Sequence, residues 1–219
     1  MNQKKILGVL AGDRMPMSIL VKWIESADLV IAADAGMLRV LEAGFVPDIV
    51  IGDFDSIPIE LVSANMKSVI DKTQETTDCG KLLDYIENKG FGSVSLVCAE
   101  GDLSDHFIDT VHCAVRSNLC VQIGLERGIA YILKGPIAKS LPAVPGNRVS
   151  LLPLEAVTNA SLSGVQWEFE GRDLSVRGFT SISNSATNSS VNVSFDEGSA
   201  YLFIESNDPE WDSLGLGPA

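Results

Sequence analysis

The sequence of 219 residues is poor in cysteine, histidine and basic side chains, and each shortage excludes a class of protein. Its four cysteines form no Cys-x-x-Cys pair and share no metal-ligand spacing with the two histidines. We therefore expect free thiols in a reducing compartment, not a disulfide framework or a zinc site. Acidic residues outnumber basic ones 29 to 16, for a net charge of −13, which argues against binding to nucleic acid or to an anionic membrane.

Long apolar runs are missing as well. No run approaches the roughly 18 apolar residues that a membrane-spanning helix needs. The N-terminal stretch MNQKKILGVLAGDR has too short an apolar run for a signal peptide, so we expect a cytoplasmic protein. The sequence also lacks the Gly-x-x-x-x-Gly-Lys-Ser/Thr and Gly-x-Gly-x-x-Gly fingerprints of common nucleotide-binding loops.

Residues 1–126 predict a mostly parallel, Rossmann-like α/β domain. Short runs rich in Val, Ile and Leu alternate with segments whose apolar residues have helical spacing. The runs are mostly unbroken by polar residues, which is typical of strands that are buried on both faces. The expected strands are 5–10, 28–34, 48–53, 68–71, 93–98 and 119–124, and the expected helices are 15–26, 36–43, 77–89 and 103–117.

Residues 127–219 predict a smaller, antiparallel β-sandwich domain. The segments become short, several alternate polar and apolar residues, and turn residues such as Pro145-Gly146 separate them. The expected strands are 128–135, 148–154, 159–165, 174–184, 189–195 and 199–206.

Four successive expected strands of the first domain end in acidic or polar residues. Because the carboxyl ends of parallel strands meet at one edge of a sheet, these side chains are expected to gather there. They are Asp34; Asp53 and Asp55; Thr77 and Asp78; and Glu100, Asp102, Asp105 and His106.

Such a gathering of carboxylates needs a counter-charge. Two carboxylates about 5 Å apart repel by roughly 3 kcal/mol at an effective dielectric constant of 20. A cluster of them persists when a cation neutralises it or when two members share a proton. Hard oxygen ligands without thiolates or imidazoles favour Mg²⁺, the usual partner of nucleotide phosphates.

Each of these residues also has a simpler explanation when it is taken alone. Asp34 can end a strand, Thr77 can be the N-cap of the next helix, and Lys81 can be a surface lysine. An apolar strand that ends in Asp-x-Asp is also how haloacid-dehalogenase-like phosphatases present their nucleophile, here Asp53. The acidic pair and the lysine that this family needs on later strands have no clear counterparts. Trp167 can be an ordinary core residue.

Taken in order, these segments resemble the thiamin pyrophosphokinase family over nearly the whole chain. AADAGMLRVLEAGFVPDIVIGDFDSI (32–57) resembles the family's Asp-Gly-Gly segment and its Pro-Asp-x-x-x-Gly-Asp-Phe-Asp-Ser signature. QETTDCGKLLDYI (74–86) resembles its Thr-Asp-x-x-Lys helix start, and GDLSDH (101–106) stands where the family has Gly-Gly-Arg-x-Asp-His. In the second domain, LSGVQWEF (162–169) and FTSISN (179–184) stand at its Gly-Leu-x-Trp/Tyr and Ser-x-Ser-Asn segments.

The resemblance implies an enzyme that transfers a diphosphate group from ATP to the hydroxyl of thiamin, giving thiamin diphosphate and AMP. It implies Mg²⁺, a nucleotide-binding catalytic domain at 1–126, a thiamin-binding domain at 127–219, and a homodimer with active sites between subunits. The residues that it carries over are Asp53, Asp55 and Asp78 for catalysis and metal; Asp34, Gly36, Arg39, Thr77, Lys81, Asp105 and His106 for ATP; and Trp167, Ser183 and Asn184 for thiamin.

Four positions depart from the family pattern, one of them Ser185, which follows Asn184. Ala35 replaces a glycine, Leu38 an asparagine, and Leu103 the arginine of Gly-Gly-Arg-x-Asp-His. A lost arginine removes a charge-assisted contact to phosphate. Two further functions therefore stay open: a relative that binds nucleotide or thiamin without turnover, and a diphosphokinase for another alcohol such as a pterin or a pyrimidine.

Overall fold

The computed structural model describes residues 4–54, 66–101 and 103–206. The chain forms two compact units that divide between Glu126 and Arg127. The first unit contains a parallel sheet with helices and the second contains antiparallel strands, so the predicted fold class is confirmed.

The first unit is built on a parallel sheet with the strand order β6-β5-β1-β2-β3-β4. Each of its described strand pairs is parallel. β1, β3 and β5 are buried along their whole length, as their mostly apolar sequences predict, and β5 also buries Ser93 and Ser95. The strands are β1 (Ile6–Val9), β2 (Leu29–Ala33), β3 (Ile49–Gly52), β4 (Lys67–Ile70), β5 (Ser93–Val97) and β6 (Cys120–Leu125).

One expectation about this sheet is wrong. β4 was expected to be a buried strand, but it is the edge strand of the order above, and Lys67, Ser68 and Ile70 are exposed. An edge strand has a partner on one side only, and its short Val-Ile segment carries no sign of this in the sequence.

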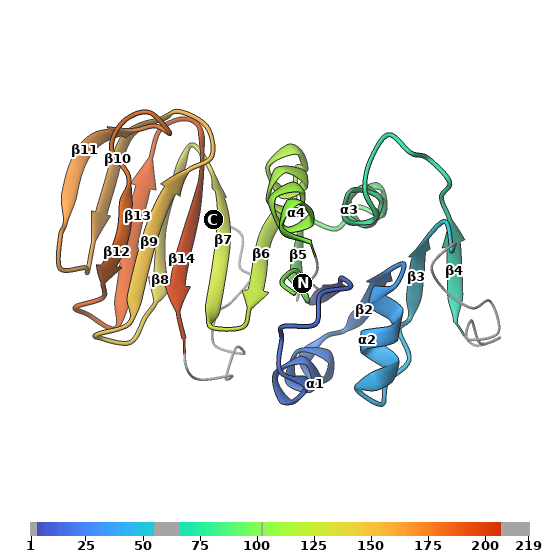
Figure 1. The fold of residues 1–219 in the computed structure, drawn as a ribbon. Coiled ribbons are helices and arrows are strands. Elements are labelled where there is room, and N and C mark those ends of the chain that lie inside the picture. The colour runs from blue at the N-terminus through green and yellow to red at the C-terminus, as the bar shows by residue number, and fades with distance from the viewer. Residues whose placement is uncertain (1–3, 55–65, 102, 207–219) are drawn as a thin grey trace. The chain divides into compact units, whose positions relative to one another are not determined.

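The helices of the first unit are α1 (Met17–Ser26), α2 (Gly36–Glu42), α3 (Asp78–Asn88) and α4 (Ser104–Arg116). α1 and α2 lead from β1 toward β3, whereas α4 leads from β5 to β6, in the opposite direction along the sheet. Because such crossovers are right-handed, the two directions place helices on opposite faces. Figure 1 shows α1 and α2 on one face and α3 beside α4 on the other. The connections diverge at β1 and β5, where open α/β sheets bind ligands beyond the strand ends.

The second unit consists of two antiparallel sheets, with the orders β12-β9-β14-β7 and β11-β10-β13-β8. Inward residues alternate with outward ones, for example in β13, where Val191, Val193 and Phe195 are buried. The strands are β7 (Gly128–Lys134), β8 (Ile137–Pro142), β9 (Arg148–Pro153), β10 (Val157–Ser163), β11 (Phe169–Leu174), β12 (Ser181–Ser185), β13 (Ser190–Phe195) and β14 (Ser199–Glu205).

β8 and β11 were not expected as strands, and the expected strand 174–184 is wrong. β8 lies between Pro136 and Pro142, which read as turn residues in the sequence. The segment 174–184 was expected to be one strand, but β11 ends at Leu174 and β12 begins at Ser181. A turn separates them, in which the Gly178 amide donates to the Ser175 carbonyl at 3.0 Å.

No helix among the described residues is both long enough and apolar enough to cross a membrane.

Candidate functional site

A cavity of about 1080 Å³ lies at the carboxyl ends of the strands of the first unit. Segments that follow β1, β2, β3, β4 and β5 contribute to its lining, together with α3 and α4. The sequence-predicted residues in this lining are Asp34, Asp53, Thr77, Asp78, Lys81 and His106.

Asp34 is the most buried carboxylate of the cavity, with 4% of its surface exposed. Its Oδ1 accepts a hydrogen bond from the Phe54 amide at 3.2 Å. A methyl group on Gly52 would lie 2.7 Å from the same oxygen, so the absence of a side chain at this position leaves room for the carboxylate. Burial and the charges of Asp78 and Asp53 raise the pKa of Asp34 above its ordinary value, against the opposing effect of the Phe54 amide.

Lys81 lies between two carboxylates, Asp53 after β3 and Asp78 at the start of its own helix α3. Its Nζ lies 3.1 Å from Asp78 Oδ1 and 3.8 Å from Asp53 Oδ2. The lysine side chain is only 4% exposed, so it is not the surface lysine that its helical position allowed. Burial lowers the pKa of Lys81, but the hydrogen bond to Asp78 and the charges of Asp78, Asp53 and Asp71 outweigh burial and raise it. The ammonium group therefore stays charged and offsets the two carboxylates.

Thr77 occupies the N-cap position of α3, as its simpler explanation predicts, but its side chain does not cap the helix. Its hydroxyl lies 2.7 Å from Asp109 Oδ2 on α4 and donates a hydrogen bond to it. Asp109 also accepts from the Cys113 thiol at 3.3 Å, and its Oδ1 lies 3.5 Å from Arg116 Nη2. Burial raises the pKa of Asp109, but Thr77, Cys113 and Arg116 together lower it below its ordinary value.

Asp109 and Arg116 are therefore two lining residues that sequence reasoning missed. Asp109 follows Asp105 by four residues, one helical turn along α4, and this spacing indicates that the two aspartates lie on the same face of the helix.

Two thiols lie beside this group of polar side chains. Cys79 on α3 and Cys113 on α4 are buried and hydrogen-bonded to each other. The Cys113 sulfur also accepts from Arg116 Nη2 at 3.0 Å. The hydrogen bond between the thiols raises the pKa of Cys79 and lowers that of Cys113. All four cysteines are free, as expected.

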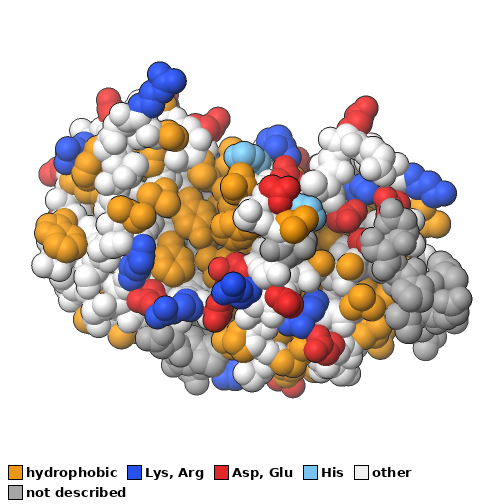
Figure 2. All heavy atoms as spheres, in the orientation of Figure 1, with side chains coloured by type: hydrophobic (Ala, Val, Ile, Leu, Met, Phe, Trp, Pro, Cys, Tyr) orange, Lys and Arg blue, Asp and Glu red, His pale blue; other side chains and the backbone are white. Residues whose placement is uncertain are grey.

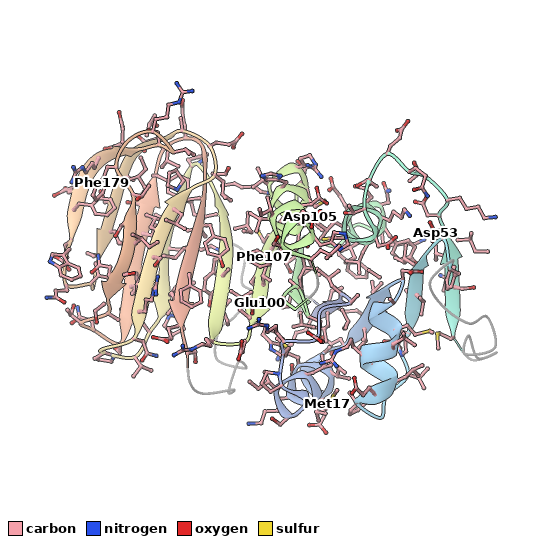
Figure 3. All side chains as sticks on the ribbon, viewed as in Figure 1. Met17, Asp53, Glu100, Asp105, Phe107 and Phe179 are labelled. Atoms are coloured by element: carbon pink, nitrogen blue, oxygen red, sulfur yellow. The ribbon has the colours of Figure 1, made fainter. Side chains whose placement is uncertain are left out.

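Three predicted ATP residues lie outside the described lining of the cavity, namely Gly36, Arg39 and Asp105. Gly36 begins α2, and a methyl group there would overlap the Val9 carbonyl. Arg39 Nη1 pairs with Glu42 Oε2 at 2.6 Å, and its Nη2 donates to the Met15 carbonyl at 3.1 Å. Asp105 is exposed in the first turn of α4; Figure 3 shows it on that helix and shows Asp53 beyond β3. Their roles toward ATP stay predictions.

Asp55, one of the three predicted metal ligands, and Asp102 lie outside the described residues. Among residues 4–54, 66–101 and 103–206, no group of three or more His, Cys, Asp and Glu side chains is arranged to hold a metal ion. The chemistry of the donors present nevertheless fits Mg²⁺. This ion is commonly bound through one or two carboxylates plus water and substrate phosphates, and Asp53 and Asp78 are two such carboxylates around one cation, the Lys81 ammonium.

The surface of the first unit carries both signs of charge. Figure 2 shows acidic and basic side chains interspersed over the visible face of the first unit. In the lining itself the acidic side chains outnumber the lysine and the arginine.

In the second unit, Asn184 holds the segment that contains Trp167. Its Oδ1 accepts from the Trp167 amide at 3.1 Å and the Ser185 amide at 2.9 Å, and its Nδ2 donates to the Trp167 carbonyl at 2.9 Å. A further contact joins Nδ2 to Ser181 Oγ at 3.3 Å. Asn184 is 2% exposed, so its side-chain amide is directed at its own backbone.

The other two predicted thiamin residues point outward. Trp167 is 60% exposed, so it is not an ordinary core residue. Ser183 is exposed and has a left-handed φ of 58°, a conformation that is uncommon without glycine and that often marks functional turns.

The sequence matches two family models, which lie in the same order as the two units. The model described as "Thiamin pyrophosphokinase, catalytic domain" matches residues 20–123, and "Thiamin pyrophosphokinase, vitamin B1 binding domain" matches residues 138–199. No curated protein matches the sequence.

Solved structures of the same fold cover nearly the whole chain. Thiamine pyrophosphokinase from Bacillus subtilis is 22% identical, with a TM-score of 0.78 over 94% of this chain and 100% of that one. Thiamin pyrophosphokinase from Geobacillus thermodenitrificans is 25% identical, with a TM-score of 0.77 over 93% and 98%. The Candida albicans protein of the same name is 15% identical, with a TM-score of 0.78 over 93% and 90%.

Proposed function

The chain belongs to the thiamin pyrophosphokinase family, and we propose on that premise that it transfers a diphosphate group from ATP to the hydroxyl of thiamin. The products are thiamin diphosphate and AMP. The observation that carries the proposal is the convergence of Asp34, Asp53, Asp78 and Lys81 on one cavity at the strand ends. Transfer of phosphoryl-type groups depends mainly on positioning and on stabilisation of charge, and these side chains supply both.

The nucleotide binds in this cavity of the first unit. Its polyphosphate lies toward the ends of β2 and β3 and the start of α3, where backbone amides at a helix N-terminus favour anions. Lys81 keeps its positive charge there and restrains the carboxylates of Asp53 and Asp78. His106, in the first turn of α4, lines the same cavity.

Asp53 and Asp78 would hold Mg²⁺, with Asp55 as the third candidate ligand. When bound, the ion would supply neutralisation of the negative charge on the transferred diphosphate. Asp34 lies against Gly52, next to these ligands. One aspartate of this cluster accepts the proton of the attacking hydroxyl.

The second unit provides the surface for thiamin. Trp167 presents an exposed ring suited to stacking on the rings of thiamin, and Ser183 presents an exposed hydroxyl. Asn184 acts through the backbone of Trp167, because its own amide is already engaged. We further propose a homodimer in the cytoplasm, with the active site completed by the partner subunit; size-exclusion chromatography with light scattering tests the dimer.

The direct test is an assay of the purified protein with Mg²⁺, ATP and thiamin, in which AMP and thiamin diphosphate are measured together. We expect equimolar products. A folded protein that makes neither product would contradict the proposal. Calorimetry that finds tight binding of ATP or thiamin without AMP release would instead identify a binding protein, the possibility raised by Leu103.

Two competing enzyme functions would give different products. A diphosphokinase for another alcohol would form AMP with a pterin or a pyrimidine and not with thiamin. A phosphatase would release phosphate from simple phosphoesters and form an aspartyl-phosphate on Asp53; the two matching family models favour the pyrophosphokinase over it.

A further inference from the structure

The charges that line the cavity are out of balance. Five acidic side chains face two basic ones, and a bound triphosphate adds further negative charge. The acidic side chains are Asp34, Asp53, Glu75, Asp78 and Asp109, and the basic ones are Lys81 and Arg116. Anion binding in the cavity therefore depends on which contacts Lys81 and Arg116 already make.

Lys81 is already committed. Its Nζ is buried and lies within 3.8 Å of both Asp53 and Asp78. Its 3.1 Å contact to Asp78 is a charge-assisted hydrogen bond, which a phosphate would have to replace. Lys81 thus organises the metal-binding carboxylates and is a poor candidate for an additional phosphate contact.

Arg116 is held far more loosely. It is the last residue of α4, and 60% of its side chain is exposed. The 3.5 Å between Nη2 and Asp109 Oδ1 is long for a hydrogen bond, and its closer contact is to a sulfur, a weak acceptor. A guanidinium group has five N–H donors in a planar fork that matches the oxygens of a phosphate. A phosphate can recruit this group without breaking a strong interaction.

Asp109 ties this arginine to the start of α3. One of its oxygens accepts from the Thr77 hydroxyl at 2.7 Å, while the other faces Arg116. The carboxylate thereby holds the guanidinium near the N-terminus of α3, where the proposed polyphosphate lies. Leu103, which stands where the family pattern has an arginine, is 60% exposed and outside the described lining.

We propose that Arg116 binds the polyphosphate of the nucleotide and that Asp109 is the residue that positions it. This inference rests on the proposed function for the identity of the nucleotide, but it concerns residues that the family pattern did not indicate. Arg116 thereby supplies the cation for phosphate binding that Leu103 does not supply.

The test compares Arg116→Gln with Arg14→Gln. Arg14 is a similarly exposed arginine of the same unit, 3.9 Å from Glu126, and lies outside the described lining, so both variants lose one positive charge. We expect Arg116→Gln to raise the KM for ATP about tenfold or more, since charge-assisted hydrogen bonds contribute this much. The KM for thiamin stays within about twofold, and Arg116→Lys recovers part of the loss. Equal KM values for ATP in the two folded glutamine variants would overturn the proposal.

The same pair separates this inference from the proposed function. If the wild-type protein forms no AMP from ATP and thiamin, the proposed function fails. Calorimetric titration with the magnesium complex of ATP, without thiamin, then still tests Arg116. Weaker binding by Arg116→Gln than by Arg14→Gln supports the inference, and equal binding overturns it.

The positioning role of Asp109 has its own test. Asp109→Asn keeps an acceptor for the Thr77 hydroxyl but removes the charge that faces Arg116. We expect a higher KM for ATP with unchanged kcat, and no further increase when Asp109→Asn is added to Arg116→Gln, because the two residues act as a unit. Additive increases in KM would show that Asp109 acts without Arg116 and would overturn its role.

Discussion

Gly36 lies where α2 comes closest to the end of β1, and its replacement by alanine tests why a glycine is present. A methyl group there would overlap the carbonyl oxygen of Val9 and lie 2.9 Å from the Val9 carbonyl carbon and 3.0 Å from that of Leu10. These are backbone atoms, so no side-chain rotation relieves the overlap. Either α2 or the end of β1 must shift, and the residues after β1 line the cavity.

The magnitude follows from two opposing effects. Overpacking costs about 1–3 kcal/mol, and the involvement of backbone alone places Gly36→Ala near the upper value. Alanine regains up to about 1 kcal/mol through its better helix propensity. The net loss of about 2 kcal/mol corresponds to a decrease in the unfolding temperature of roughly 4–8 °C for a protein of this size.

Thermal unfolding followed by circular dichroism measures this loss, and Gly178→Ala is the control. The nearest atom to a methyl group at Gly178 is the Ser175 Oγ at 2.8 Å, a hydroxyl that can rotate away, so we expect no loss of stability. If Gly36→Ala unfolds at or above the wild-type temperature, the packing argument is refuted. A raised KM for ATP without that loss would instead assign Gly36 to the nucleotide.

Three further predictions concern charges and hydrogen bonds. Asp34→Asn raises the unfolding temperature at neutral pH, because a raised pKa means that the ionised form destabilises the fold; this gain shrinks as the pH falls through the folded-state pKa toward 3.8. Lys81→Met lowers the unfolding temperature by exposing Asp53 to uncompensated repulsion, and MgCl₂ restores more stability to the variant than it adds to the wild type. Asn184→Ala lowers the free energy of unfolding by about 2–4 kcal/mol, because the amide and carbonyl of Trp167 lose their hydrogen-bond partner. The same change shifts the fluorescence of Trp167 and raises the KM for thiamin but not for ATP.

The cavity of the first unit could be predicted from the sequence because its signals are local. An unbroken apolar run followed by an acidic residue marks the end of a buried strand, and parallel geometry brings such ends to one edge. Asp34 and Asp53 were identified in this way, and Asp78 by its place at the start of the helix that follows the fourth run; all three line the cavity. The direction of the Lys81 side chain could not be predicted from the local sequence, because it depends on contacts with two carboxylates from different segments.

The orientation of α4 was less predictable. Its apolar spacing predicts a buried stripe of Phe107, Ile108, Val111 and Val115. Val111 is buried, but Ile108 is 55% exposed, and the polar Thr110 and Cys113 are buried as well. Asp109 of this helix accepts a hydrogen bond from a polar partner on the neighbouring segment, the Thr77 hydroxyl. Hydrophobic periodicity carries no information about such a partner, so the residues that accompany it were missed.

The second unit shows a related limit. β11 has the sequence FEGRDL, with four consecutive exposed residues, so it lacks the alternation that identifies a strand. The resemblance assigns Asn184 to thiamin, but a sequence does not show whether an amide faces a ligand or the protein's own backbone. Its burial and its hydrogen bonds to the backbone at Trp167 answer that question.

The anchoring by Asn184 has a practical consequence for protein engineering. Because Asn184 grips the amide and carbonyl of residue 167 and not its indole, the position in space of that residue is fixed independently of which side chain it carries. Residue 167 can therefore be substituted while Asn184 still holds its backbone. With Trp167 in the role proposed for it, we expect a library of side chains at this position to alter the choice of acceptor alcohol without loss of the β-sandwich fold.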